Sequence, residues 1–384
     1  MTTIEVPPPP ADHVRVEPGH EGAWRIGWRG VRTVAVLELR QRVRSTRWIV
    51  VLVIWVAVLA ALTLLIRHAV HSALEPLGDV GGTGAQQAAD AQRLAGATLF
   101  GIIVFLVLSL GGLVAPALTA TSINGDRAAG VLAALQTTLL TPAEIAVGKL
   151  AAAWVTALAL LAAASPFVIW AYVDGGTPAG RLVTTLAVLA LTLLVVCAVG
   201  LGWSAITART SSSTVLTYLS VMFLGLGLPL LFLLSLPLVQ SQDTVQVSTS
   251  SDGSACAPTT QLRAQFHTER SWWLLGANPY VVVADSAPKA ERVSGVGLDD
   301  PLSAIRDGVR EARLGPPAVV DECYLNQASY DEQQAQRQAQ REALGATWPY
   351  GLAADLALGA GFTALAVRRL TTPSRRLPRG TRVA

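Results

Sequence analysis

The side chains of this sequence that could carry out chemistry are few and scattered. Ser204 lies in a Gly-Trp-Ser-Ala sequence inside a long apolar block, where a buried histidine would have to activate it as a nucleophile. Every histidine, however, lies outside such blocks. The five are His13, His20, His68, His71 and His267. The sequence therefore predicts no catalytic residue and no enzymatic activity in this chain.

Candidate metal and nucleotide sites are equally incomplete. His68 and His71 can share one face of a helix, but two histidines alone do not make a metal site, and we expect solvated side chains. Residues 143–149 end in Gly-Lys but lack the first glycine and the Ser or Thr of a phosphate-binding loop. We expect this chain to bind no metal and no cofactor of its own.

Asp355 is the only acidic residue well inside an apolar block. An ionised carboxylate at the middle of a membrane costs about 3 kcal/mol or more, so it must face a cavity or a partner, or be protonated. Ala353, Ala357 and Gly361 follow a spacing of four on the same helix and predict close helix packing. Two interpretations stay open: a substrate path or gate, and a structural hydrogen bond between helices.

The elements that must position these residues are transmembrane helices. Hydrophobic residues make up 52% of the 384 and charged residues 14%, against roughly 25% charged in soluble domains. Six continuous blocks are long enough to cross a bilayer as helices. They are residues 48–66, 95–120, 150–173, 182–206, 214–239 and 346–367. We predict an all-α polytopic membrane protein with six transmembrane helices.

The arginines predict the orientation. Eight precede the first block, and six follow the last block with no acidic residue among them, so the positive-inside rule puts both termini in the cytoplasm. Residues 121–149 then lie in the cytoplasm and residues 240–345 outside. The excess of Arg over Lys suggests a GC-rich bacterial genome. We expect a multi-pass protein of the bacterial cytoplasmic membrane, surrounded by lipid and without a nucleic-acid partner.

The remaining segments divide the chain further. Residues 1–30 are expected to form a disordered cytoplasmic tail, and residues 368–384 a basic one. Residues 31–47 predict a helix approaching the membrane, in which Glu38 and Arg42 can pair at i,i+4. This helix is either an interfacial elbow or a positive flank that only sets the topology.

The polar segment from Thr121 to Lys149 lies between two apolar blocks and predicts two short helices. Thr141 can cap the second one, with Pro142 at its first position and Glu144 completing a capping box. Asp126 can cap the first in the same way. The apolar residues of the first helix are predicted to share one side, opposite Arg127, as a docking face along the membrane surface. They are Val131, Leu132 and Leu135.

Residues 240–345, which we call the outer region, are long enough for a small module. The sequence SWWLLGANPYVVVADSAP within it predicts either an interfacial segment or a buried strand, and residues 330–344 predict a polar helix leading to the last span. Cys256 and Cys323 lie in this oxidising compartment and predict a disulfide, the alternative being two free thiols.

Together these features resemble the membrane subunit of ABC-2-type exporters, which carry an elbow helix, six spans and a cytoplasmic coupling segment between spans two and three. That family's pattern is matched by Asp126, Arg127, Gly130, Leu132, Leu135, Thr141, Pro142, Glu144, Gly148 and Lys149. Asn278-Pro279-Tyr280 followed by ADSAP also resembles a segment of related permeases. Two departures are Asp126 in place of the more usual Glu, and the length of the outer region.

The resemblance implies that a separate cytoplasmic ATPase subunit binds ATP and docks on residues 126–141. It also implies a second permease subunit, identical or related, and export of a substrate through the interface between the two. Two other classes remain at this stage. An ion-coupled secondary transporter would use Asp355, and a membrane-anchored sensor or assembly protein would act through the outer region.

Overall fold

The computed structural model describes residues 20–78, 84–136, 139–175, 179–249, 257–288, 301–317, 319–321 and 327–371. Most of the predicted basic tail and most of the predicted N-terminal tail lie outside these residues. Cys256 and Cys323 do too, so the predicted disulfide falls outside the described part of the chain. Within it, Cys197 is the single cysteine, and it is buried and free.

The prediction of six membrane-spanning helices is confirmed by length and composition. The candidate spans are Trp48–Ala69, Ala95–Ala128, Pro142–Val173, Gly180–Ile206, Thr210–Val239 and Trp348–Leu370. The corresponding helices are α3 (Thr46–Gly78), α4 (Gly84–Thr119), α7 (Pro142–Gly175), α8 (Ala179–Ile206), α9 (Thr210–Met222) continued by α10 (Leu228–Ser235), and α15 (Trp348–Leu370). The chain is therefore a multi-pass membrane protein.

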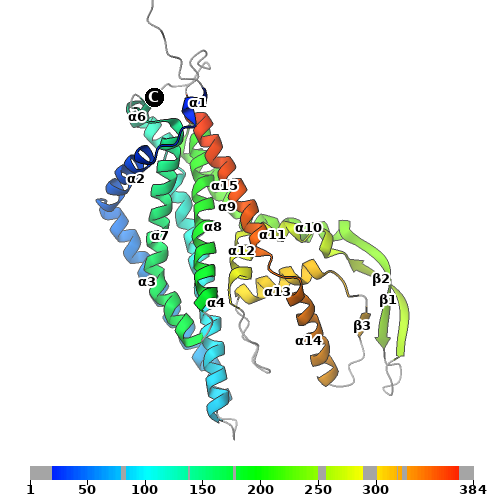
Figure 1. Ribbon diagram of the computed structural model, residues 1–384. Helices are drawn as coiled ribbons and strands as arrows, with labels where there is room; N and C mark the ends of the chain where they lie inside the picture. The colour runs from blue at the N-terminus through cyan, green and yellow to red at the C-terminus, as the bar shows by residue number, and fades with distance from the viewer. Residues whose placement is uncertain are drawn as a thin grey trace, which may run out of the picture.

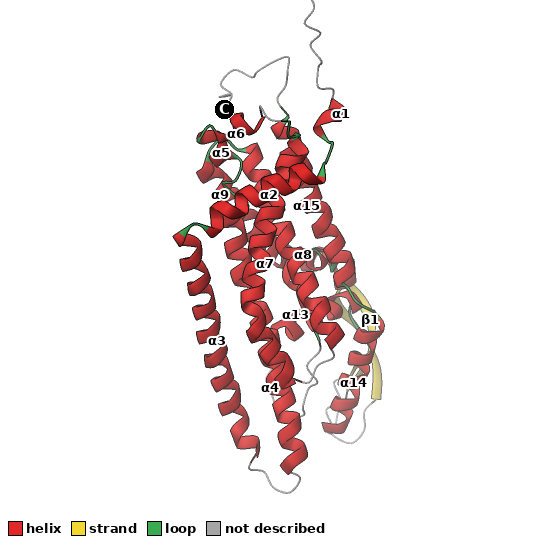
Figure 2. Cartoon of the chain, turned by 60° about the vertical axis from the view of Figure 1, so that its left-hand side comes forward, coloured by secondary structure: helices red, strands yellow, loops and turns green. Residues whose placement is uncertain are grey.

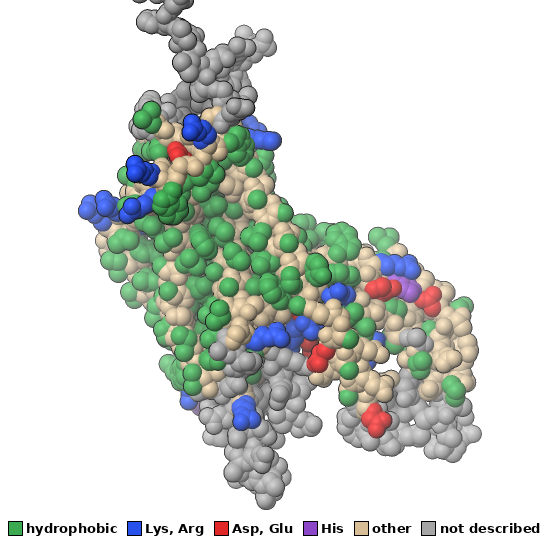
Figure 3. Space-filling model, in the orientation of Figure 1, with side chains coloured by type: hydrophobic (Ala, Val, Ile, Leu, Met, Phe, Trp, Pro, Cys, Tyr) green, Lys and Arg blue, Asp and Glu red, His purple; other side chains and the backbone are tan. Residues whose placement is uncertain are grey.

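Helix α8 lies at the centre of the bundle, between α15 on one side and α4 and α7 on the other (Figure 1). The buried hydrophobic side chains are mostly aliphatic, with Leu59, Val104 and Leu189 among the most enclosed. Hydrophobic side chains also cover the outside of the bundle (Figure 3), as expected for helices that contact lipid rather than water.

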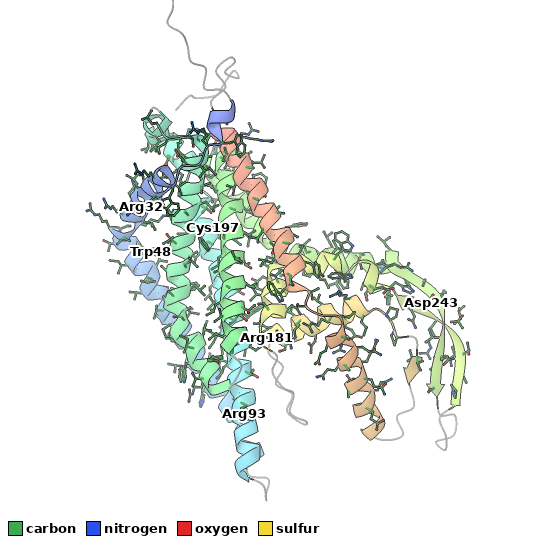
Figure 4. All side chains as sticks on the ribbon, in the orientation of Figure 1. Arg32, Trp48, Arg93, Arg181, Cys197 and Asp243 are labelled. Atoms are coloured by element: carbon green, nitrogen blue, oxygen red, sulfur yellow. The ribbon has the colours of Figure 1, made fainter. Side chains whose placement is uncertain are left out.

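The two ends of the bundle differ. The short helix α1 (His20–Ala23), α2 (Trp28–Val43), α5 (Asn124–Ala128) and α6 (Val131–Gln136) gather at one end, which we call the α2 end (Figure 2). The last residues of α15 pack there as well, in a core cluster with Ile123 and Leu132. Arg32 lies at the α2 end, whereas Arg93 and Arg181 lie toward the opposite end (Figure 4).

The fifth span is not one straight helix. A π-helical turn, η1 (Phe223–Gly227), separates α9 from α10, and in Figure 1 α10 runs away from the bundle, across the direction of α8. Pro229 explains the interruption, because it has no N–H to give to the carbonyl of Gly225 four residues earlier. The 3₁₀ turn η2 (Leu236–Val239) then leads into the outer region.

The outer region contains a small sheet beside its helices, which the helical prediction did not include. Strands β1 (Gln240–Thr249) and β2 (Ala257–Phe266) form an antiparallel hairpin, and β3 (Val319–Asp321) pairs with β1 in parallel. The chain also forms η3 (Thr268–Arg270), α11 (Trp273–Gly276), α12 (Pro279–Ser286), α13 (Pro301–Leu314) and α14 (Gln327–Ala343). The predicted polar helix before the last span is confirmed by α14.

The segment containing Trp272 and Trp273 does not form the predicted buried strand, while the alternative, an interfacial segment, stays a prediction. It folds into the helices α11 and α12, and every residue of α12 except Tyr280 is buried against the spans. Asn278 caps α12, since its Oδ1 accepts a hydrogen bond from the N–H of Tyr280 at 2.8 Å. The valines that suggested a strand lie instead on a short helix that is buried on nearly all sides.

The base of the β1–β2 hairpin carries an imidazole held between two carboxylates. His267 Nδ1 lies 2.6 Å from Glu269 Oε1, and Nε2 lies 2.6 Å from Asp243 Oδ2. Hydrogen bonds to Glu269 and then Asp243 raise the pKa of His267. Hydrogen bonds from Ser241 and then His267 lower the pKa of Asp243. Asp243 is labelled on the hairpin in Figure 4.

Candidate functional site: the junction of α2 with the polar segment

The capping box predicted at the start of α7 is confirmed. The backbone N–H of Glu144 donates to Thr141 Oγ1 at 3.2 Å, and the N–H of Thr141 donates to Glu144 Oε2 at 2.9 Å. Pro142 is the first residue of the helix. Both capping side chains also bind the chain before α2: Thr141 Oγ1 donates to the carbonyl of Arg25, and Glu144 Oε1 accepts from the N–H of Gly27. The box therefore joins two segments that are more than 100 residues apart.

Lys149 carries the strongest electrostatic link of this junction. Its ammonium group is bonded to Glu38 of α2, and it lies 2.6 Å from Asp126 Oδ2 of α5. The Lys149 side chain is 1% exposed, whereas both carboxylates are partly solvated. One buried cation thus pairs with two acids from two other helices, and Arg42 lies 4.0 Å from one of them, Glu38. Such pairing is what makes a buried lysine tolerable.

Helix α2 lies along α7 through a row of matched contacts. A Cβ at Gly148 would lie 2.6 Å from Val34 Cβ, so only glycine allows α2 to come this close. Further along, Arg42 donates to Thr156 Oγ1 at 2.9 Å and to the carbonyl of Leu118 at 3.2 Å. Burial lowers the pKa of Arg42, and Glu38, four residues away on the same helix, opposes that shift.

The prediction that Asp126 caps α5 is wrong. The residue preceding α5 is Ile123, and the cap comes from α8 instead: Ser204 Oγ accepts from the N–H groups of Ile123 and Asn124 at 2.9 and 3.2 Å. The amide of Asn124 also donates to Thr207 and to the carbonyl of Arg209. Ser204 is therefore a structural residue, and Asp126 is free to pair with Lys149.

The predicted single docking face is also corrected. Gly130 adopts φ +72°, which breaks the segment into α5 and α6 and shifts the helical phase. As a result Leu132 is 2% exposed and packs inside the chain, and Leu135 packs beside the same cluster. Among the described residues of the segment, the large apolar side chains that are exposed are Val131 and Leu139. Arg127 is partly exposed on α5.

Asp355 lies on the face of α15 that packs against α8. It is 2% exposed, and within the described residues its Oδ2 has no hydrogen-bond partner. The predicted interhelical hydrogen bond is thus not formed by the described residues. The predicted packing stripe of Ala353, Ala357 and Gly361 is exposed in this chain, so the described residues do not use it for helix packing. The packed positions, at the same spacing of four, are Gly351, Asp355 and Gly359.

Sequence reasoning missed two participants of the junction. Glu38 was recognised only as a partner of Arg42, and Ser204 only as a rejected nucleophile. For Glu38 a signal existed: an acid within the apolar arc of an amphipathic helix must meet a cation on the element that covers it. The sequence offered Lys149 as that cation, since it is one of only two lysines in the chain.

Within the described residues, no group of three or more His, Cys, Asp or Glu side chains is arranged to hold a metal ion. The apolar helical bundle defines a polytopic helical membrane protein, with a polar network at the α2 end. The ABC-2 family transporter protein model matches residues 32–268, more than half of the chain, so this protein belongs to the ABC-2 transporter permeases. A comparison with curated proteins found no match.

Proposed function

We propose that this chain is the permease subunit of an ATP-driven exporter of the bacterial cytoplasmic membrane, moving a substrate that is not identified. A separate cytoplasmic ATPase subunit would bind and hydrolyse ATP, and this chain would carry out no chemistry. In this proposal α2 is the elbow helix, α5 and α6 belong to the coupling segment, and both termini are cytoplasmic. Family membership and the arginine-rich α2 end support it.

The observation that carries the proposal is the bonding of Lys149 to both Glu38 and Asp126. Through this cation and the capping box, the elbow helix, the coupling segment and the third span are fastened to one another. A displacement of α5 by a docked ATPase would therefore move α2 and α7 together as a rigid unit. Coupling requires such a rigid unit, because a displacement of α5 then reaches the spans without being lost in local rearrangement.

The exposed side chains define where the ATPase would dock. Val131 and Leu139 would supply the apolar contact, with Arg127 at its edge. Leu132 and Leu135 would support this surface from inside, and Thr141, Pro142 and Glu144 would hold the start of α7 in place. The site residues inferred from the resemblance thus keep a role in coupling, divided between a contact layer and a supporting layer.

The test is the amount of ATPase recovered with the permease from membranes. Replacing Leu139 or Val131 with Asp removes apolar contact and puts an unpaired charge into the interface, so we expect the ratio of ATPase to permease to fall roughly tenfold or more. Leu262→Asp is the matched control, since Leu262, on β2 of the outer region, has an exposure of 69%, between those of Val131 (44%) and Leu139 (104%). Leu132→Asp should lower the abundance of the permease instead.

A normal ratio in a well-expressed variant carrying both Val131→Asp and Leu139→Asp would contradict the docking surface. Leu262→Asp must leave the ratio of ATPase to permease normal, because only then does a lowered ratio report docking.

The proposal also includes a second permease subunit, identical or related. The fifth span supports it, because only 6% of its most apolar window is buried within this chain.

Asp355 is the observation that favours the alternative of ion-coupled transport. Its buried carboxyl group has an oxygen, Oδ2, with no hydrogen-bond partner among the described residues, which suits a proton or cation path. Within the ABC-2 proposal, the same residue is a candidate for the substrate path or gate. The family match supports the ATP-driven function over the alternative.

A further inference from the structure

The segment Asn278-Pro279-Tyr280 to ADSAP has no part in the coupling junction, yet it is among the most enclosed parts of the molecule. Helix α12 is buried between the spans, and Val282, Val283 and Ala284 are fully enclosed. Both of its ends lead back to the outer region. A short helix that enters the bundle from one side must have its terminal polar groups satisfied by protein. Those partners come from three different spans.

The first end of α12 is tied to the fifth span. While Asn278 Oδ1 caps α12, its Nδ2 donates to the carbonyl of Gly225 at 2.8 Å. That carbonyl belongs to η1 and lacks its α-helical donor, because Pro229 has no N–H. Tyr280 lies against the same turn: a Cβ at Gly225 would be 3.0 Å from its ring. Asn278 thus stabilises the point at which the fifth span changes direction.

The second end of α12 is tied to the fourth and sixth spans. Asp285 Oδ2 accepts from the backbone N–H groups of Thr347 and Trp348 at 2.5 and 3.0 Å, and so caps α15. Thr185 of α8 donates to the carbonyl of Ser286 at 3.2 Å. The Asp285 side chain is 1% exposed, so its charge is held entirely by protein groups.

Asp285 also connects α12 to the rest of the outer region. Arg310 of α13 binds Asp285 Oδ1 through Nε at 2.8 Å and through Nη2 at 2.7 Å. The residue after Arg310, Glu311, binds Arg341 and Arg337 of α14, the helix that leads into α15. A movement of α13 or α14 therefore reaches α12 through an ion pair and not only through apolar contact.

We propose that α12 is a buried link between the outer region and the spans. Asn278 stabilises the bend of the fifth span, and Asp285 caps the start of the sixth. Release of either end is the step by which a movement of the outer region would change the arrangement of these spans. Asn278 and Asp285 are positioning residues in this mechanism. The inference concerns the permease alone and stands independently of the ATPase partner.

Hydrogen exchange of the purified full-length permease, followed by mass spectrometry of its peptides, tests whether α12 links these spans to the outer region. Asn278→Asp keeps an oxygen that can cap α12 but replaces the donor to Gly225 with a carboxylate that repels this carbonyl. We expect exchange to become roughly tenfold faster in α12, η1 and α10, and to change less than twofold in α2 and α7. Asp285→Asn should have the corresponding effect on α12 and α13.

The matched control is Asn124→Asp, because Asn124 is as buried as Asn278 but lies at the α2 end. It should accelerate exchange in α5 and leave η1 unchanged. Gly225→Ala is a milder variant for the case in which Asn278→Asp does not fold. It pushes Tyr280 away from the bend and should accelerate the same peptides about threefold. Unchanged exchange in η1, or equal acceleration in all spans, would overturn the proposal.

Discussion

Lys149→Met removes the cation that α2 and α5 share, and its effect on stability can be worked out from the structure. Methionine fills the volume of the lysine stem, so little packing is lost. Glu38 and Asp126, however, are left close to each other without their cation. Breaking a fully buried pair costs about 3–5 kcal/mol, and partial solvation of both carboxylates reduces this to about 3 kcal/mol. Thermal unfolding of the purified permease at neutral pH should show this loss.

A second variant separates stability from coupling. Combining Lys149→Met with Glu38→Gln and Asp126→Asn removes the stranded charges while keeping the shapes of all three side chains. Replacement of a buried ionic group with neutral groups of similar volume is often nearly neutral for stability, so most of the lost stability should return. Coupling should not return, because the thioether of methionine and the two amides cannot form the ion pairs by which the ammonium group of Lys149 links three helices.

The assay is the stimulation of ATP hydrolysis when the ATPase is mixed with the permease in lipid discs. We expect it to stay at least fivefold below wild type in the triple variant, a difference of about 1 kcal/mol. Wild-type stimulation in the triple variant would refute the idea that the ion network transmits movement. Unchanged stability in Lys149→Met would refute the network itself.

Two further outcomes are expected at the ends of the molecule. Thr141→Ala should lower the stability of the permease to thermal unfolding by about 1 kcal/mol through loss of the cap, and Thr141→Ser should restore most of it. At the hairpin, the stabilising contribution of His267 is complete below its ordinary pKa of 6.5 and is lost as pH rises through the raised value, while that of Asp243 is complete above 3.8 and is lost as pH falls through the lowered value. Glu269 also flanks the imidazole, and Arg270 also favours ionised Asp243. Both contributions are complete between pH 3.8 and pH 6.5, so limited proteolysis of β1–β2 should be slowest in that range and faster at about pH 8.5. His267→Gln should abolish the alkaline change. A flat profile in the wild-type protein would contradict the paired imidazolium.

Features determined by short stretches of sequence could be predicted. The six spans follow from hydropathy because a bilayer demands a minimum apolar length, whatever the fold. The capping box at Thr141 and Glu144 follows from a spacing of three, since both hydrogen bonds lie within one turn. The pair of Glu38 with Arg42 is likewise a matter of helical geometry. In each case the interacting groups are neighbours in sequence, so their relation needs no knowledge of the tertiary structure.

Features determined by distant partners could not be predicted in the same way. Asp126 was expected to cap its own helix, but Ser204, 81 positions after Ile123, already occupies that role. Leu132 was expected beside Val131 on the docking face but is buried, because Gly130 takes a left-handed conformation, which resets the phase of the helix. A periodic pattern carries across a glycine only if the backbone stays helical there, and the sequence does not say whether it does.

Helix ends in this protein are repeatedly capped by side chains from other elements. Ser204 of the fourth span caps α5, Asp285 of α12 caps α15, and Asn278 serves both its own helix and the interrupted turn at Gly225. A cap within one helix moves with that helix, whereas a cap from another element must break when the two separate. An uncapped helix end costs free energy, so each of these bonds is either formed or broken. The bundle therefore has separate arrangements and does not deform gradually. The residues that hold them, more than the apolar faces between the spans, are where substitutions should change how readily the permease moves from one arrangement to the next.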